Sequence, residues 1–98
     1  MEKIILIIIA TVNPAEKEAL NHYLTEMNIL YAKIEAKPVS KYKISKTLIG
    51  ELEPNLVSIM EFPSKQAVDA VFKSEEYQKL LPYREKAFLK VEAFLSEE

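Results

Sequence analysis

One short segment of the sequence gathers the side chains best suited to hold an anion. Arg84 is the only arginine in the chain, and Tyr77 and Tyr83 lie close to it along the sequence. A guanidinium presents its N–H groups as a planar fork that matches a carboxylate, and a nearby phenol can add a further hydrogen bond. The segment therefore predicts an anion-binding site. An ion pair between Arg84 and a neighbouring glutamate is the alternative explanation for the same residues.

Two further tyrosines could present hydroxyls to a small molecule. Tyr23 lies on the apolar stripe of a predicted helix, and Tyr42 lies on a predicted strand. A phenol that enters a cleft between sheet and helices can donate a hydrogen bond to a substrate oxygen. We therefore take Tyr23, Tyr42, Tyr77 and Arg84 as the candidate ligand-binding residues. A place in the core is the alternative for Tyr23 and Tyr42.

Three other polar residues are weaker candidates. His22 is the only histidine, and histidine is a common general base or ligand. At 100° per residue, however, His22 points away from the apolar stripe of its helix. Glu61 interrupts an apolar strand, where a partly buried carboxylate can act as a general base, but its place near the strand end favours exposure. Tyr83 is the third candidate, because it adjoins Arg84.

The sequence carries no motif for a nucleotide, a metal ion or a covalent intermediate. It contains no P-loop, no GxGxxG, no HExxH and no GxSxG, and it has no cysteine. Its formal net charge of -2 lacks the basic excess that nucleic-acid binding requires. We therefore expect no cofactor, no metal and no nucleic-acid partner.

Four strands are predicted to position these residues. The apolar runs over 4–9 and 56–62 have the unbroken composition of central strands. Looser alternation over 39–49, and clear alternation from residue 86 onward, are typical of edge strands. The sheet is therefore expected to be apolar at its centre and amphipathic at its edges.

Two helical regions complete the pattern. Asn13-Pro14 starts a helix that extends to about Leu30. A second region starts at Pro63-Ser64, breaks near Lys73-Ser74 and stops near Pro82. The resulting order, βαββαβ, predicts an α+β ferredoxin-like fold, with a four-stranded antiparallel sheet and two helices on one face.

Chain length and the first apolar run limit the kind of protein. The 98 residues bury enough surface for one small core and not for two, so residues 1–98 are expected to form a single domain. The run over 4–9 is far too short to cross a bilayer, and no small-residue cleavage pattern follows it. We expect a cytoplasmic protein with no membrane partner.

In a monomer, one apolar face of the predicted sheet would remain exposed to solvent. Two helices cover only one face, whereas the runs over 4–9 and 56–62 place apolar side chains on both faces. An exposed apolar patch of this kind usually marks an association surface. We therefore expect a homodimer joined through the sheet face.

Two segments of the sequence resemble the domain of unknown function 1330 family. Residues 60–65 read MEFPSK, and residues 74–85 read SEEYQKLLPYRE. The family pairs an (I/M)EFPS strand-to-helix junction with an S-P-E-Y-Q-x-L-x-P-x-R segment. This resemblance extends over most of the chain and implies a dimeric α/β barrel, related in fold to antibiotic-biosynthesis-type monooxygenases and muconolactone isomerase. By that analogy of fold, an enzyme here would be monooxygenase-like or isomerase-like and cofactor-independent.

Two kinds of function agree with these features. The first is a small homodimer that binds or transforms a small organic molecule without a cofactor, in a cleft between sheet and helices. The second is a non-catalytic dimeric interaction or regulatory module, in which the polar residues are structural and the sheet face serves assembly. Replacement of Arg84 by alanine separates them, because lost stability without any effect on a ligand favours the second.

Overall fold

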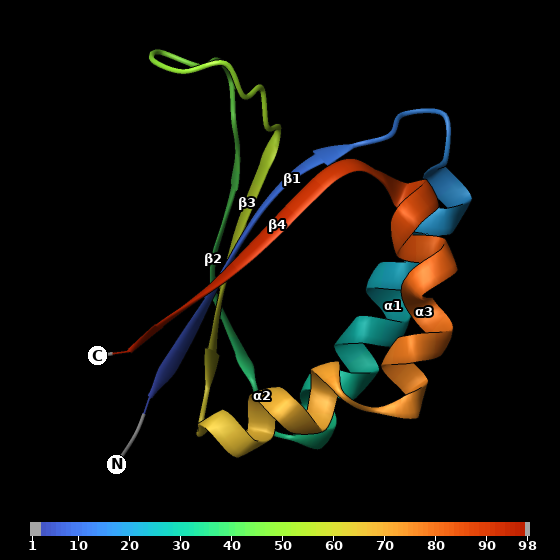
Figure 1. Cartoon of the computed structure of the whole chain (residues 1–98), viewed down its shortest axis with the longest axis vertical. Helices are drawn as coiled ribbons and strands as arrows, with labels where there is room; N and C mark the ends of the chain where they lie inside the picture. The colour runs from blue at the N-terminus through green and yellow to red at the C-terminus, as the bar shows by residue number, and fades with distance from the viewer. Residues whose placement is uncertain (1–2, 98) are drawn as a thin grey trace.

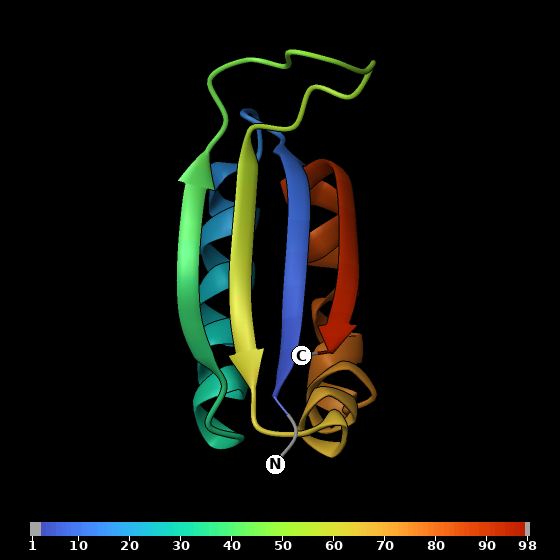
Figure 2. The same ribbon diagram turned by 90° about the vertical axis from the view of Figure 1, so that its left-hand side faces the viewer.

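A computed structural model describes residues 3–97 and has the predicted ferredoxin-like architecture. Its four strands form one antiparallel sheet in the order β2-β3-β1-β4. All three helices lie on the same side of that sheet (Figures 1 and 2). The elements, in chain order, are β1 (Ile4–Val12), α1 (Lys17–Lys33), β2 (Lys37–Lys43), β3 (Leu56–Phe62), α2 (Lys65–Phe72), α3 (Glu75–Ala87) and β4 (Phe88–Glu97).

The pairing of β1 with its two neighbours explains why both of its faces are apolar. Side chains alternate along a strand, so Ile4, Leu6, Ile8 and Ala10 face the helices while the residues between them face away. Ile7, for example, lies opposite Ile59 of β3 and Phe94 of β4. We call the sheet surface that no helix covers the open face. Its apolar residues include Ile5, Ile7, Ile9, Tyr42, Val57, Ile59 and Phe94, and the register also places Glu61 and Glu92 on it.

The core lies between the sheet and the helices. Phe62, at the end of β3, has 0% of its surface exposed, and Val71 of α2 has 1%. Burial of a side chain of this size contributes about 1.5–3 kcal/mol each. The tyrosine rings of α1 extend this core, since Tyr23 packs edge to face on Phe88 and Tyr31 on Phe62. The core therefore places α1 against both ends of the sheet.

The first helix begins later than the sequence predicts. The helix was predicted to start at Asn13-Pro14, but the Asn13 Oδ1 atom accepts a hydrogen bond from the N–H of Ala15 at 3.1 Å, which closes a local turn. The helix starts only at Lys17, and Glu16 precedes it without a side-chain cap. Asparagine side chains commonly form such turns, and here the turn competes with capping.

The last helix continues through the proline at which it was predicted to stop. As predicted, the helical region breaks at Ser74, whose Oγ accepts a hydrogen bond from the N–H of Tyr77 at 3.1 Å. Pro82 lies inside α3, which extends to Ala87. A proline removes one hydrogen bond, here to the carbonyl of Gln78. Because Gln78 and Pro82 are both exposed, water can replace that bond.

No residue separates α3 from β4. The helix ends at Ala87 and the strand begins at Phe88. The carbonyl of Ala87 accepts a hydrogen bond of 2.8 Å from the N–H of Asn13, at the end of β1. This junction ties the last turn of α3 directly to the sheet.

The segment 44–55 is a long connection rather than the second half of a strand. A strand was predicted over 39–49, but β2 ends at Lys43, opposite Leu56, where its partner β3 begins. The connection projects beyond the sheet (Figures 1 and 2). It turns at Gly50, whose φ of 111° lies in the left-handed region that favours glycine.

Candidate ligand-binding site

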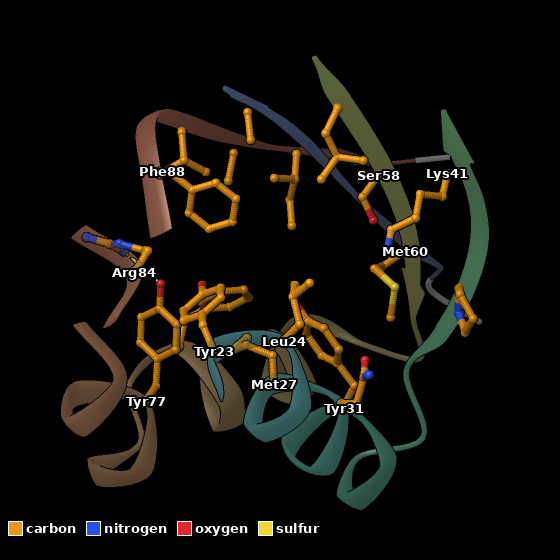
Figure 3. A pocket seen from close by; sticks show the side chains of 18 of the residues that line it. Tyr23, Leu24, Met27, Tyr31, Lys41, Ser58, Met60, Tyr77, Arg84 and Phe88 are labelled. Atoms are coloured by element: carbon orange, nitrogen blue, oxygen red, sulfur yellow. Dashed lines mark hydrogen bonds between the residues drawn. The ribbon is translucent and has the colours of Figure 1, made fainter. Parts of the chain in front are cut away.

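A cavity of about 360 Å³ lies between the sheet and the helices. Its walls are largely apolar, and a small number of polar side chains enter from two sides (Figure 3). Cavities of this size and character commonly hold small molecules. The apolar lining residues include Ile8, Leu24, Met27, Leu56, Met60, Phe72, Phe88 and Val91, and the polar ones are Tyr23, Asn28, Tyr31, Ser40, Lys41, Ser58, Tyr77 and Arg84.

Arg84 and Tyr77 form one polar end of the cavity. They lie seven residues apart on α3, which places them on the same side of the helix. The Nη1–H of Arg84 donates a hydrogen bond of 2.7 Å to the hydroxyl oxygen of Tyr77. Within residues 3–97, no carboxylate lies at ion-pair distance from Arg84. The alternative pairing with a neighbouring glutamate is therefore absent from the described structure.

Tyr23 and Tyr31 add two buried phenols from α1. Burial raises the pKa of the Tyr23 hydroxyl, and the adjacent Tyr77 raises it further. Burial likewise raises the pKa of Tyr31, with a smaller contribution from Tyr77. Both hydroxyls therefore keep their protons at neutral pH. They can donate hydrogen bonds to a ligand, and they cannot act as bases.

The second polar side of the cavity is formed by residues of the sheet, together with Asn28 and Tyr31 of α1. Lys41 of β2 and Ser58 of β3 are neighbours in the sheet register and point the same way. In Figure 3 they lie across the cavity from Arg84. Lys41 is exposed, whereas Ser58 is half-buried. The cavity thus has a partly buried cation at one end and a solvated cation at the other.

The charge of the cavity differs from that of the whole protein. The chain has a formal net charge of -2, yet both charged side chains that line the cavity, Arg84 and Lys41, are cations. Among residues 3–97, no aspartate, glutamate or histidine lines the cavity. In the part of the chain that the structure describes, no group of three potential metal ligands is found either. The cavity is therefore built to attract negative charge.

The candidate residues fall into two groups. Tyr23, Tyr77 and Arg84 line the cavity together. The expectation that Tyr42 points into the same cleft has to be corrected. Tyr42 lies opposite Val57 on the open face and is 55% exposed. One residue of β2 is skipped in the pairing between Pro38 and Ser40, and such an irregularity reverses which side chains face the helices.

The three weaker candidates lie outside the cavity lining. His22 is exposed on α1, and its ring packs against that of Tyr83 of α3, with 4.2 Å between the ring centroids. Glu61 lies opposite Ile5 on the open side of the sheet, and its Oε1 is 3.7 Å from the Nζ of Lys3. Neither His22 nor Glu61 is placed to act on a molecule in the cavity.

Sequence reasoning missed five polar residues of the cavity, which are Asn28, Tyr31, Ser40, Lys41 and Ser58. Tyr31 follows Tyr23 and Met27 at a spacing of four, so extension of the helix by one residue would have found it. Lys41 lies on the edge strand predicted over 39–49, and Asn28 lies at the margin of the apolar stripe. No signal in the sequence distinguishes these two from ordinary surface residues.

An antiparallel sheet with helices on one face, and a cavity between the layers, define a protein of the ferredoxin-like class. Residues 7–95 match the model of a family described as a domain of unknown function, DUF1330, and the chain belongs to that family. No curated protein sequence matches the chain significantly. In residues 3–97, no helix has the length and apolar character needed to cross a membrane.

Solved structures share this fold at low sequence identity. The RPA0582 protein of unknown function from Rhodopseudomonas palustris has a TM-score of 0.86 at 18% identity, over 99% of this chain and 82% of that one. A dabb family protein with a ferredoxin-like fold from Mesorhizobium loti has a TM-score of 0.65 at 10% identity, over 98% and 96%. A dimeric ferredoxin-like protein of unknown function from Thermobifida fusca has a TM-score of 0.61 at 10% identity, over 99% and 92%. These likenesses confirm the predicted fold.

Proposed function

We propose that this protein is a homodimer that binds a small organic molecule in the cavity of each protomer, without a cofactor. The observation that supports this proposal is the cavity itself. Its apolar walls can remove an organic body from water, and its few hydroxyls can fix the orientation of that body. Tyr23, Tyr31 and Tyr77 supply these hydroxyls from two different helices. A structural role alone would not require an opening of about 360 Å³ beside them.

The chemistry of the lining favours binding over conversion. A cofactor-free reaction usually needs a group that can remove a proton at neutral pH. Of the residues that the structure describes, no carboxylate and no histidine lines the cavity, and the raised pKa values of Tyr23 and Tyr31 keep both phenols protonated. The available groups are hydrogen-bond donors and cations. They can hold a molecule and polarise its oxygen atoms.

The open face supports the homodimer. Phe94 is 50% exposed and lies beside Ile7, which in turn lies beside Ile59, so an apolar band crosses the sheet. A two-fold axis through such a band lets each protomer cover the band of the other. The Thermobifida fusca relative, which shares the fold, is described as dimeric.

Native mass spectrometry of protein purified without denaturation tests assembly and occupancy together. A dimer that carries a reproducible additional mass supports the proposal. Leu24→Trp places a large ring in the cavity and should remove that mass, because Leu24 lines the cavity. Ile29→Trp is the matched control, since Ile29 lies on the same helix but is 49% exposed and outside the lining. A dimer without additional mass, in the unmodified protein and in both variants, favours the non-catalytic interaction module instead.

A further inference from the structure

We infer that the ligand of the cavity is a small monocarboxylic acid with an apolar body, held with its carboxylate at Arg84 and Tyr77. This inference rests on the proposed binding function and names the class of ligand. The body would be a phenyl group or a medium-length alkyl chain. It would extend from Arg84 along Leu24, Met27 and Phe88, which line the cavity between its two polar sides (Figure 3).

The surroundings of Arg84 call for an anion. The side chain is partly buried, and a buried cation is costly unless an anion or hydrogen bonds compensate it. In residues 3–97 no carboxylate compensates it, and its hydrogen bond there, to Tyr77, uses one N–H of five. The remaining N–H groups are available as a fork. A carboxylate is the organic anion whose two oxygens fit such a fork.

The two phenols beside Arg84 complete a set of donors. The oxygen of Tyr77 accepts a hydrogen bond from Arg84, so its own O–H can still donate to a ligand. Burial, and then the neighbouring Tyr77, raise the pKa of the Tyr23 hydroxyl, so this hydroxyl stays protonated and can also donate. A carboxylate accepts at both oxygens, whereas a neutral amide brings an NH₂ group that needs acceptors. This end of the cavity therefore selects the acid over its amide.

The number and position of the cations favour a ligand with a single negative charge. Among the described lining residues, Arg84 is the only cation at the Tyr77 end, whereas a phosphate dianion commonly engages several cations or a helix N-terminus. Lys41 lies across the cavity and is exposed, so salt screens its charge. It can raise the rate at which anions enter without fixing their position.

The test compares acids and amides of the same shape. Phenylbutanoate and octanoate are titrated into isotope-labelled protein, alongside phenylbutanamide and octanamide, and binding is followed by amide chemical shifts. We expect at least one acid to bind about tenfold more tightly than its amide, with shifts centred on Tyr23, Tyr77 and Arg84. The affinity for the acid should fall below about pH 5, where its carboxyl is protonated, while that for the amide should not.

Two variants of α3 assign the preference to Arg84. Arg84→Gln should bring acid and amide within about twofold of each other. Lys86→Gln removes the same charge from an exposed position on the same helix, outside the cavity lining, and should keep the preference. If Arg84→Gln does not give a dispersed spectrum, Arg84→Lys keeps the charge, loses the fork and should show a reduced preference.

The outcomes separate the inference from the proposed function. If acid and amide bind equally well, the binding function stands and the carboxylate inference fails. If Arg84→Gln still prefers the acid, a group other than Arg84 binds the carboxylate, and the inference also fails. If none of the four probes shifts any cavity resonance, both the inference and the binding function are overturned.

Discussion

The guanidinium of Arg84 donates a hydrogen bond of 2.7 Å to the hydroxyl of Tyr77, two turns earlier on the same helix. The same guanidinium carbon lies 5.9 Å from the centre of the Tyr77 ring. The phenol therefore orients the cation by its oxygen and supports it by its ring. Each of the two side chains fixes the conformation of the other at one end of the cavity.

Removal of this hydrogen bond should have a measurable effect on stability. We expect Tyr77→Phe to lower the free energy of unfolding by about 1 kcal/mol, because Arg84 loses a partly buried acceptor. Urea-induced unfolding measures the change. Tyr83→Phe is the control, since Tyr83 is 40% exposed and lies outside the cavity lining; its effect should stay within about 0.5 kcal/mol. Equal effects of the two variants would contradict the role assigned to the bond.

The helix cap at Ser74 should affect the cavity as well as stability. Ser74→Ala removes the acceptor for the N–H of Tyr77 and should cost about 1 kcal/mol. Ser64→Ala removes the equivalent cap of α2, which accepts from the N–H of Ala67, and should cost about as much. Only Ser74→Ala should also weaken the binding of phenylbutanoate, since only this cap positions Tyr77. If both variants weaken the binding of phenylbutanoate equally, the Ser74 cap does not act by positioning Tyr77.

Stability should fall at high pH because of the buried phenols. In the folded protein the pKa values of Tyr23 and Tyr31 are raised above the ordinary value of 10.0. The stabilisation is therefore fully present below pH 10 and is lost as the pH rises toward the raised native values, because only the unfolded chain ionises in that window. Each phenol adds a slope of about 1.4 kcal/mol per pH unit. Urea unfolding at increasing pH measures it.

A tyrosine-to-phenylalanine variant isolates this effect from other groups that titrate at high pH. Tyr31→Phe should reduce the slope above pH 10 while leaving the other titrating groups in place. If Tyr31→Phe has the same slope of stability against pH as the unmodified protein, the Tyr31 hydroxyl ionises as readily in the folded protein as in the unfolded chain, and the explanation is wrong.

The open face can be tested with two neighbouring residues of β4. Phe94 and Leu95 are 50% and 54% exposed, but Phe94 lies opposite Ile7 on the open face and Leu95 lies opposite Leu6 on the helix side. We expect Phe94→Lys to convert the homodimer to a monomer, because it buries a charge at the proposed interface. Leu95→Lys should leave the dimer intact. Sedimentation velocity distinguishes the two, and an unaffected dimer in Phe94→Lys would exclude this face as the interface.

The central strands were predictable because their composition is set by burial. The range 56–62 was predicted as a strand and is β3, since a central strand is apolar on both faces and few other patterns resemble it. The helix break at Ser74 was predictable because a serine side chain caps the next helix there. Both features depend on interactions within or next to the element itself.

Two of the errors arose where contacts outside the local sequence decide the structure. Tyr42 was assigned to the cleft, but the face of an edge strand depends on its register against β3, and one skipped residue changes it. Pro82 was taken as a helix end, but Leu80 and Ala87, which are buried on either side of it, keep α3 continuous. The sequence near Tyr42 and Pro82 does not contain this information.

The direct junction between α3 and β4 determines how a ligand would meet Arg84. Connecting loops usually absorb the movement of a binding residue, but none exists between Ala87 and Phe88. The bond from Asn13 to the carbonyl of Ala87 further ties this point to β1. Arg84, three residues earlier, therefore has a fixed position relative to the sheet. This end of the cavity is preorganised, so a ligand would bind there without the entropic cost of ordering a loop.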